Sequence, residues 1–198
     1  SKEKQGLSNP VVGRTIEDKN GNLWIGTEGG GLNYFNRRTH EFKWYRPQEG
    51  RNSISHNNVK ALYYDADKEI IWIGTHLGGL NRLDIRSGHF THYRMEDNNR
   101  QTLPSDIVRD IIPYKDLLIV ATQNGVCLFD PDSGKCRQLF KDSKEGKSIK
   151  MVADILLDSE GTLWIAATGE GVFSYRFDTR KLTNYRHDTA DPHSISNN

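Results

Sequence analysis

Hydrophobic residues occur along this chain in short runs that are separated by polar turns. Inside many of these runs apolar and polar positions alternate, as in Glu41–Tyr45, which reads Glu-Phe-Lys-Trp-Tyr. Alternation with a period of two is typical of β-strands that bury one face. No segment keeps a 3.6-residue apolar period between helix caps. The pattern therefore predicts many short strands and no long helix.

The runs recur with one period along the whole chain. The segment Leu23–Thr27 has copies that carry Trp72 and Trp164, and a further copy in which Leu118 stands for the tryptophan. From Trp24 onward these positions are 48, 46 and 46 residues apart. Two more markers keep a similar spacing, an aliphatic one at Leu7, Ile54, Leu103, Ile149 and Ile195 and an aromatic one at Tyr45, Tyr93, Phe140 and Tyr185. Three markers with a common period indicate a repeat architecture.

Each repeat is expected to contain four antiparallel strands joined by tight turns that are rich in Gly, Asp and Asn. Four such strands per repeat are the signature of a β-propeller blade. We therefore predict an all-β fold of four four-stranded antiparallel blades, and a fragment of a larger propeller. The predicted limits are residues 7–53, 54–102, 103–148 and 149–194, with 195–198 at the start of a following blade.

Residues that recur from blade to blade are expected to serve the fold. One blade cannot bury both of its faces, so the tryptophans and aliphatic residues are predicted to fill the layers between stacked blades. The structural repeat residues are Trp24, Trp72, Trp164, Gly26, Gly74, Gly31 and Gly79. An open series of blades also leaves an apolar face at each end. These faces predict a homo-oligomer, or closure of the four blades into a small strained ring.

Composition excludes several classes of protein. Lys and Arg number 27 against 26 Asp and Glu, so the net charge of +1 leaves no electrostatic footprint for nucleic acid. No apolar stretch is long enough to cross a membrane, and we expect no membrane contact. The mean hydropathy of -0.73 is low, yet 4 Trp and 8 Tyr argue against disorder. Thin blades with many turns account for both observations.

Motifs that carry chemistry are weak in this sequence. The glycine-rich run Gly26–Gly31 looks like a phosphate-binding loop, but the Gly-Lys-Ser/Thr that would follow is missing, so a turn is favoured. His89 and His92 lie three residues apart on a predicted strand and therefore face opposite sides. No carboxylate pair is singled out for acid–base work. We expect no catalytic residue, no metal and no cofactor.

The two cysteines lie on consecutive strands of the third blade. If the intervening hairpin centres near Pro131 and Asp132, then Cys127 and Cys136 are cross-strand neighbours and a disulfide is sterically feasible. The other blades carry apolar residues at the position of Cys136, which favours a buried thiol. Both alternatives stay open at this point.

Residues that vary from blade to blade are the candidates for recognition. In a propeller the turns after strand two and the lead-ins to strand one lie on the same rim. Amide, imidazole and charged groups gather in these segments, and such groups suit a hydroxyl-rich ligand or a partner protein. Solvated turn residues without a ligand explain the same pattern equally well. The candidate ligand-binding residues are Glu28, His56, Asn57, His76, Gln123, Asn124 and Glu170.

The repeats resemble the two-component regulator propeller repeat. The resemblance rests on Leu7–Val11, Asp18–Thr27 and Gly30–Asn33 in the first blade, and on matching segments in the second. It covers almost all of the chain, and the third blade departs from it most. It implies blades of a seven-bladed propeller in the periplasmic sensor region of an inner-membrane hybrid two-component system of the Bacteroides type. Such systems often detect fragments of complex glycans.

From the resemblance we expect a non-catalytic sensory module whose parent protein is a sensor histidine kinase, with the kinase domain absent from this chain. The implied partners are an oligosaccharide, neighbouring blades and further sensor domains of the parent protein. A protein–protein interaction scaffold is the main alternative. A propeller lyase or glycosidase is less favoured, because the sequence offers no acid–base set at the propeller axis.

Overall fold

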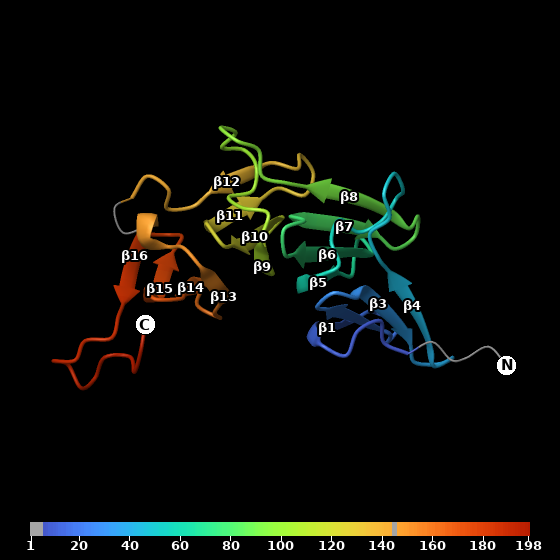
Figure 1. Ribbon diagram of the computed structural model, residues 1–198. Coiled ribbons are helices and arrows are strands. Elements are labelled where there is room, and N and C mark those ends of the chain that lie inside the picture. Colours follow the sequence, from blue (N-terminus) through green and yellow to red (C-terminus); the bar gives the residue numbers. More distant parts are fainter. Residues whose placement is uncertain (1–5, 144–145) are drawn as a thin grey trace. The chain divides into compact units, whose positions relative to one another are not determined.

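The computed structural model describes residues 6–143 and 146–198, and in this part the chain forms antiparallel sheets of four strands each (Figure 1). The first sheet contains β1 (Val12–Glu17), β2 (Leu23–Thr27), β3 (Gly31–Asn36) and β4 (Glu41–Tyr45). The second contains β5 (Val59–Asp65), β6 (Ile70–Thr75), β7 (Leu80–Asp84) and β8 (His89–Tyr93). In both sheets the strand order follows the chain, which gives the simple meander of a propeller blade.

The remaining strands form two more meanders. The third sheet contains β9 (Val108–Tyr114), β10 (Leu117–Thr122), β11 (Gly125–Phe129) and β12 (Cys136–Gln138). The fourth contains β13 (Val152–Leu157), β14 (Thr162–Ala167), β15 (Gly171–Arg176) and β16 (Lys181–Tyr185). One turn of 3₁₀ helix, η1 (Gly146–Ser148), precedes β13. The predicted all-β architecture of four-stranded antiparallel blades is confirmed.

The chain divides into two compact units, and each unit pairs two neighbouring blades. Unit 1 holds the residues up to Arg94 together with Asp106–Val108. Unit 2 holds Met95–Ser105 and Arg109–Asn198. The limits of the individual blades stay predictions.

The core of unit 1 lies between its two sheets. Trp24 from β2 is 2% exposed and packs with Ile71 and Ile73 of β6. The close approach of the sheets depends on Gly26, because a Cβ atom there would lie 2.5 Å from Val59 Cγ1. Tyr45 of β4 stacks on the Trp24 ring with centroids 5.7 Å apart. The tryptophan therefore fills the layer between the blades.

Unit 2 has the same kind of core between β9–β12 and β13–β16. Ile119 and Leu128 of the third blade pack in one cluster with Ile155 and Phe173 of the fourth. Aromatic rings extend this cluster at one end, where Tyr114 stacks on Phe177 with centroids 4.3 Å apart and Phe140 meets Tyr175 edge to face. Each unit thus buries one continuous apolar layer.

Two sequence assignments in the third blade are wrong by one residue. Trp24 pairs with Tyr34 and Trp72 with Arg82, and the corresponding pair in the third blade is Ile119 with Leu128. Ile119, not Leu118, therefore occupies the tryptophan position. Leu139 N–H donates to Val126 O, so Leu139, and not Phe140, occupies the position of the aromatic marker. Phe140 lies outside β12. The sequence comparison matched side-chain type, whereas strand pairing sets the register.

In each blade of unit 1, the turn between the second and third strands holds a glycine at a strained backbone position. Gly31 and Gly79 have φ of +81° and +71°, a region that side chains rarely adopt. A Cβ at Gly79 would lie 2.3 Å from Tyr93 O, and the approach at Gly31 is similarly close. Only glycine therefore allows this turn to lie against the end of the fourth strand.

Cys127 and Cys136 are free buried thiols in the third blade. Cys127 pairs with Gln138 and Cys136 with Phe129, so the cysteines are diagonal cross-strand neighbours. The hairpin centres one residue later than the sequence suggested. The Cys127 thiol donates to Cys136 Sγ at 3.4 Å. This hydrogen bond and complete burial raise the pKa of Cys127 well above the ordinary thiol value.

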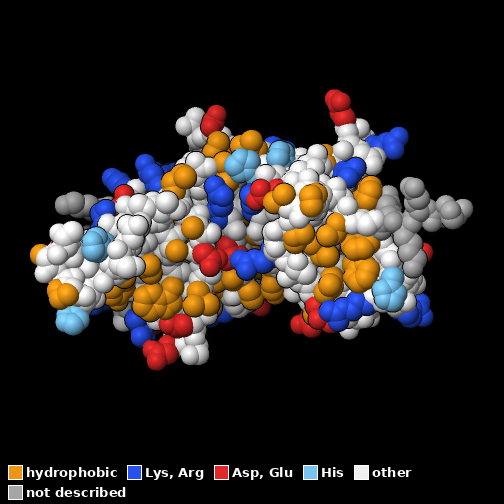
Figure 2. All heavy atoms as spheres, turned by 60° about the horizontal axis from the view of Figure 1, so that its bottom comes forward, with side chains coloured by type: hydrophobic (Ala, Val, Ile, Leu, Met, Phe, Trp, Pro, Cys, Tyr) orange, Lys and Arg blue, Asp and Glu red, His pale blue; other side chains and the backbone are white. Residues whose placement is uncertain are grey.

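Hydrophobic side chains also reach the surface in several groups (Figure 2). In the fourth blade Tyr185 is 43% exposed, and its ring lies 5.8 Å from that of the half-buried Trp164. Beside them is a shallow hollow of about 220 Å³ that Thr162, Ser174, Arg176, Lys181 and Thr183 also line. This face is therefore mixed, and not apolar as predicted for an end face. Pairing of such faces in a homo-oligomer stays a prediction.

Candidate functional site

The rim of unit 1 is built where the β2–β3 turn meets the lead-in to β5. The backbone N–H groups of Gly29 and Gly31 donate to Asn57 O at 3.2 and 2.7 Å. Glu28 and Asn58 form an isolated antiparallel bridge beside them. These backbone bonds hold the turn of one blade against the lead-in of the next, so side chains from both blades meet.

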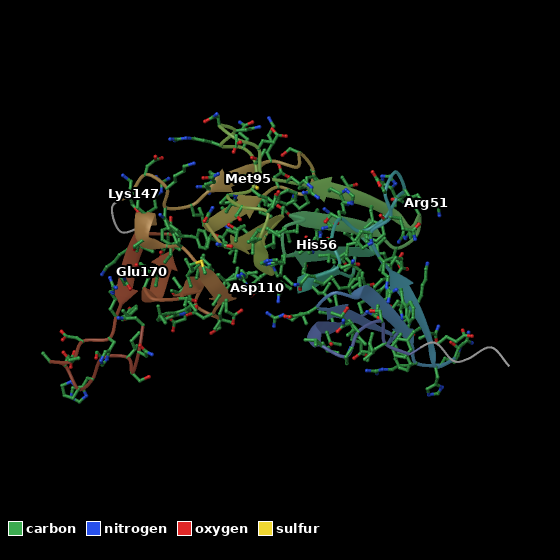
Figure 3. The ribbon with its side chains drawn as sticks, viewed as in Figure 1. Arg51, His56, Met95, Asp110, Lys147 and Glu170 are labelled. Carbon is green, nitrogen blue, oxygen red and sulfur yellow. The ribbon has the colours of Figure 1, made fainter. Side chains whose placement is uncertain are left out.

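Five polar side chains gather at this junction, and we call them the rim cluster. They are Glu28, His56, Asn58, Lys60 and His76. The Lys60 ammonium donates to the Glu28 carboxylate, which leaves an ion pair at the surface. The rings of His56 and His76 lie 6.5 Å apart. His56 is labelled in Figure 3, on the lead-in to β5.

Two atoms of the rim cluster have no hydrogen-bond partner among the residues that the structure describes. They are Asn58 Oδ1 and His76 Nδ1, and both are buried. Buried polar atoms are nearly always paired in folded proteins, so each such exception calls for an explanation. The backbone of both residues is well held, since His76 N–H donates to Asn58 O at 2.9 Å.

Electrostatics divide the rim cluster into an ionised and a neutral part. The hydrogen bond from Lys60 and its charge lower the pKa of Glu28. Burial, with repulsion from His76 and Arg94, lowers the pKa of His56. At neutral pH the site therefore presents a carboxylate and an ammonium beside an uncharged His56. Such a set donates and accepts hydrogen bonds but carries little net charge.

The structure brings together four of the predicted residues, Glu28, His56, Asn57 and His76. The side chain of Asn57 is exposed, and it acts through its backbone carbonyl. The sequence interpretation did not include Lys60 because it treated the residue as part of a regular strand. A register shift between Val59 and Ala61 interrupts β5 at that position.

The other predicted residues lie in unit 2 and do not form one cluster. Gln123 O accepts the N–H of Met151 at 2.7 Å, and Asn124 lines a separate cleft. Glu170 pairs with Arg186 at 3.2 Å. Their roles in ligand binding stay predictions.

Within 6–143 and 146–198, no three His, Cys, Asp or Glu side chains are grouped so that they could hold a metal ion. No helix in this part of the chain has the length and apolar character needed to span a membrane.

Comparisons with known proteins match this fold. A family model for the SMP-30/Gluconolactonase/LRE-like region matches residues 60–196, and one for the two component regulator propeller matches residues 6–29. No curated protein matches the chain. These comparisons and the architecture define a β-propeller protein with sensor-type repeats. The chain belongs to the SMP-30/Gluconolactonase/LRE-like family and carries the two-component regulator propeller repeat that its sequence predicted.

Solved structures from B. thetaiotaomicron are similar over most of the chain. The extracellular domain of a protein described as the hybrid two component system BT3049 is 26% identical, with a TM-score of 0.82 over 92% of this chain. An extracellular domain of BT4673 is 22% identical, with a TM-score of 0.74 over 94% of this chain, which supports the fold alone. The chain spans about a quarter of the length of these structures, 25% and 26% respectively.

Proposed function

We propose that the chain is a non-catalytic sensory module in the periplasmic sensor region of a hybrid two-component system, and that it recognises glycan fragments. The observation that supports the sensory role is the likeness to the extracellular domain of BT3049, at 26% identity and a TM-score of 0.82. The same likeness supports periplasmic exposure and signalling to a kinase as parts of this proposal.

The rim cluster supports the ligand class. Sugar hydroxyls both donate and accept hydrogen bonds, and the rim cluster offers a carboxylate, an ammonium, an amide and two imidazoles within one junction. Because the junction joins two blades, a ligand bound there would favour one packing of the blades over others. A sensor of this kind works by such differential binding.

A titration of the chain with neutral and acidic oligosaccharides, followed by calorimetry, tests the proposal. We expect a neutral oligosaccharide to bind and its affinity to fall about tenfold in Glu28→Ala/His76→Ala, since two or more hydrogen bonds are lost. The matched control is Glu17→Ala, which removes an exposed carboxylate that pairs only with Arg37 at the surface. Absence of binding to every oligosaccharide would contradict glycan recognition.

A protein-docking scaffold is the second candidate, and Leu77 favours it. Leu77 lies on the rim with φ of +72°, where the first and fourth blades have Gly29 and Gly169, and it is 56% exposed. A leucine in this conformation is strained, and strain of this kind is common at functional sites. We expect Leu77→Gly to stabilise the fold by up to about 1 kcal/mol in urea unfolding, and to weaken partner binding if the scaffold function holds.

The name of the matched family includes an enzyme, gluconolactonase, so enzymatic turnover is a third possibility to measure beside glycan recognition and protein docking. Incubation of the chain with lactones and oligosaccharides, with product analysis, decides it. We expect no product above a buffer control. A measurable rate of turnover that is lost in Glu28→Ala/His76→Ala, or in a variant of the cleft that Asn124 lines, would contradict the non-catalytic proposal.

A further inference from the structure

A cleft of about 750 Å³ opens on the rim of unit 2, and we call it the unit 2 cleft. Its floor is apolar and buried, formed by Leu103, Val126, Leu139 and Ile149. Its walls carry amides from Asn98, Asn99, Asn124 and Gln138. This volume is typical of sites that bind small ligands. Figure 3 labels Met95 and Lys147, which lie on the two segments that bound it, Lys147 in η1.

The unit 2 cleft exists because two rim segments are shorter than their counterparts in unit 1. The turn between the second and third strands of these blades begins at a threonine whose hydroxyl donates to a backbone carbonyl at the end of the turn. That carbonyl lies four residues after Thr27 and Thr75, but only three residues after Thr122. Strand β13 begins three residues after Ile149, whereas β5 begins five residues after Ile54. Both deletions remove rim residues from the same place in unit 2.

In unit 1 the corresponding place is filled. Ser55 N–H donates to Asn81 Oδ1 at 2.8 Å, and Ser55 Oγ donates to Gly78 O at 2.8 Å. In the third blade, the residues at the positions of Ser55 and Asn81 are Pro104 and Cys127. Proline has no N–H to donate, so the same lock cannot form. The lead-in is then free to bound a cleft.

Among the lining residues that the structure describes, positive charges outnumber negative ones in the unit 2 cleft. Arg100, Lys141, Lys147 and Lys150 line it, against Glu96 and Asp97. Arg100 pairs with Asp142 at 3.6 Å, and Glu96 accepts a hydrogen bond from Asn99. The three lysines form no ion pair with any residue that the structure describes. They are exposed and available to an anionic ligand.

We propose that the unit 2 cleft binds an oligosaccharide that carries carboxylate or sulfate groups. The anionic character follows from the three exposed lysines, which form no ion pair with a described residue, while the saccharide character rests on the proposed function and on the amides of the walls. Met95, 42% exposed, and the apolar floor provide a surface for the C–H face of a sugar ring. The site is separate from the rim cluster, which lies in unit 1.

Calorimetric titration of the chain tests this inference, with trigalacturonate as the carboxylate probe, a chondroitin sulfate disaccharide as the sulfate probe and galactotriose as the neutral probe. We expect at least one acidic probe to bind more tightly than galactotriose. Added salt should weaken that binding, because it screens the lysines. Lys147→Gln/Lys150→Gln should lower the affinity about tenfold, as expected for the loss of charge-assisted hydrogen bonds.

The matched control is Lys135→Gln/Arg137→Gln, which removes the same charge from exposed residues of unit 2 outside the cleft. It should leave the affinity unchanged. Equal binding of the acidic and neutral probes, or equal affinity in the cleft variant, overturns the inference and leaves the proposed function intact. Binding of neither acidic probe also overturns it, whereas the proposed function is decided by neutral probes and by the rim cluster variant.

Discussion

Unit 1 and unit 2 use the same pair of stacked meanders but finish their rims differently. In unit 1 both blades close the rim with an asparagine, because Asn33 Oδ1 accepts Ser8 N–H at 2.9 Å and Asn81 Oδ1 accepts Ser55 N–H. In unit 2 the asparagine positions hold Cys127 and Phe173. The apolar layers are alike, so the rim can change without a change of fold.

Residues of the rim change together between the two units. An asparagine at position 127 would have no N–H to accept from Pro104, and an unpaired buried amide is costly. Cys127 is fully buried and places no such demand on its surroundings. Loss of the lock and shortening of the turn occur in the same blade, which leaves room for the unit 2 cleft.

The largest expected effect distinguishes the two kinds of turn. Gly79→Ala places a Cβ 2.3 Å from a backbone oxygen at a φ of +71°. Strain and clash together should cost more than about 3 kcal/mol. Gly125→Ala in unit 2 meets no atom closer than 3.6 Å and suffers only the cost of its φ of +119°, about 1–3 kcal/mol.

Urea unfolding of both variants measures these costs. Equal destabilisation by Gly79→Ala and Gly125→Ala would contradict the view that the shorter turn of unit 2 is less tightly packed.

A smaller effect is expected at the acidic turn that holds the tryptophan. Asp18 accepts hydrogen bonds from the N–H groups of Asn20 and Asn22 and from Trp24 Nε1, at 2.9, 3.0 and 3.2 Å. Asp18→Ala leaves these donors without a partner at a buried site and should cost about 2–3 kcal/mol.

Asp158 accepts the corresponding hydrogen bonds in the fourth blade, from the N–H groups of Glu160 and Thr162 and from Trp164 Nε1. The bonds from Trp164 and Thr162 lower the pKa of Asp158. Trp164 is only half-buried, so water can replace the lost partner. Chemical denaturation should show a smaller loss for Asp158→Ala. A loss as large as that of Asp18→Ala would show that burial of the tryptophan does not set the cost.

The smallest expected effect concerns pH. The pKa of His56 is lowered from 6.5, mainly by burial. Below that pH the unfolded chain takes up the proton more readily than the folded chain. The contribution of His56 to stability is therefore complete above pH 6.5 and is lost as the pH falls toward the folded pKa. We expect the free energy of unfolding, measured in urea, to fall less between pH 7.5 and pH 5.5 in His56→Asn than in the unsubstituted chain.

Asparagine suits this test because Asn9, at the same position of the first blade, accepts the N–H of Val11 just as His56 Nδ1 accepts that of Asn58. His89→Asn, on an exposed part of β8, is the control and should keep the full pH dependence. An unchanged pH dependence in His56→Asn would show that burial of this imidazole has no energetic effect.

The sequence predicted the meanders well because each strand is marked by its own turn. The glycines of the Gly31 and Gly79 turns are recognisable as residues, and positive φ explains why they recur. The one-residue errors at Ile119 and Leu139 arose because pairing, which fixes the register, is invisible to a comparison of side-chain types.

The site was only partly predictable for a related reason. Glu28 and His56 could be placed on one rim from topology alone, but the register shift that interrupts β5 at Lys60 could not. The sequence did not reveal the unit 2 cleft, because the cleft arises where the turn after β10 and the lead-in to β13 are shorter than their counterparts in unit 1. Counting residues from Thr122 to Gly125, and from Ile149 to Val152, against the other blades was the signal that could have revealed it.

We propose that differences at the rim, and not in the apolar layers, decide what each unit binds. Amide chemical-shift mapping of the chain during titration with trigalacturonate tests it most directly. We expect shifts at Asn124, Lys147 and Lys150 and none at Gly78 and Gly79, where the rim is closed. Shifts centred on the exposed face of the fourth blade, around Trp164 and Tyr185, would contradict it.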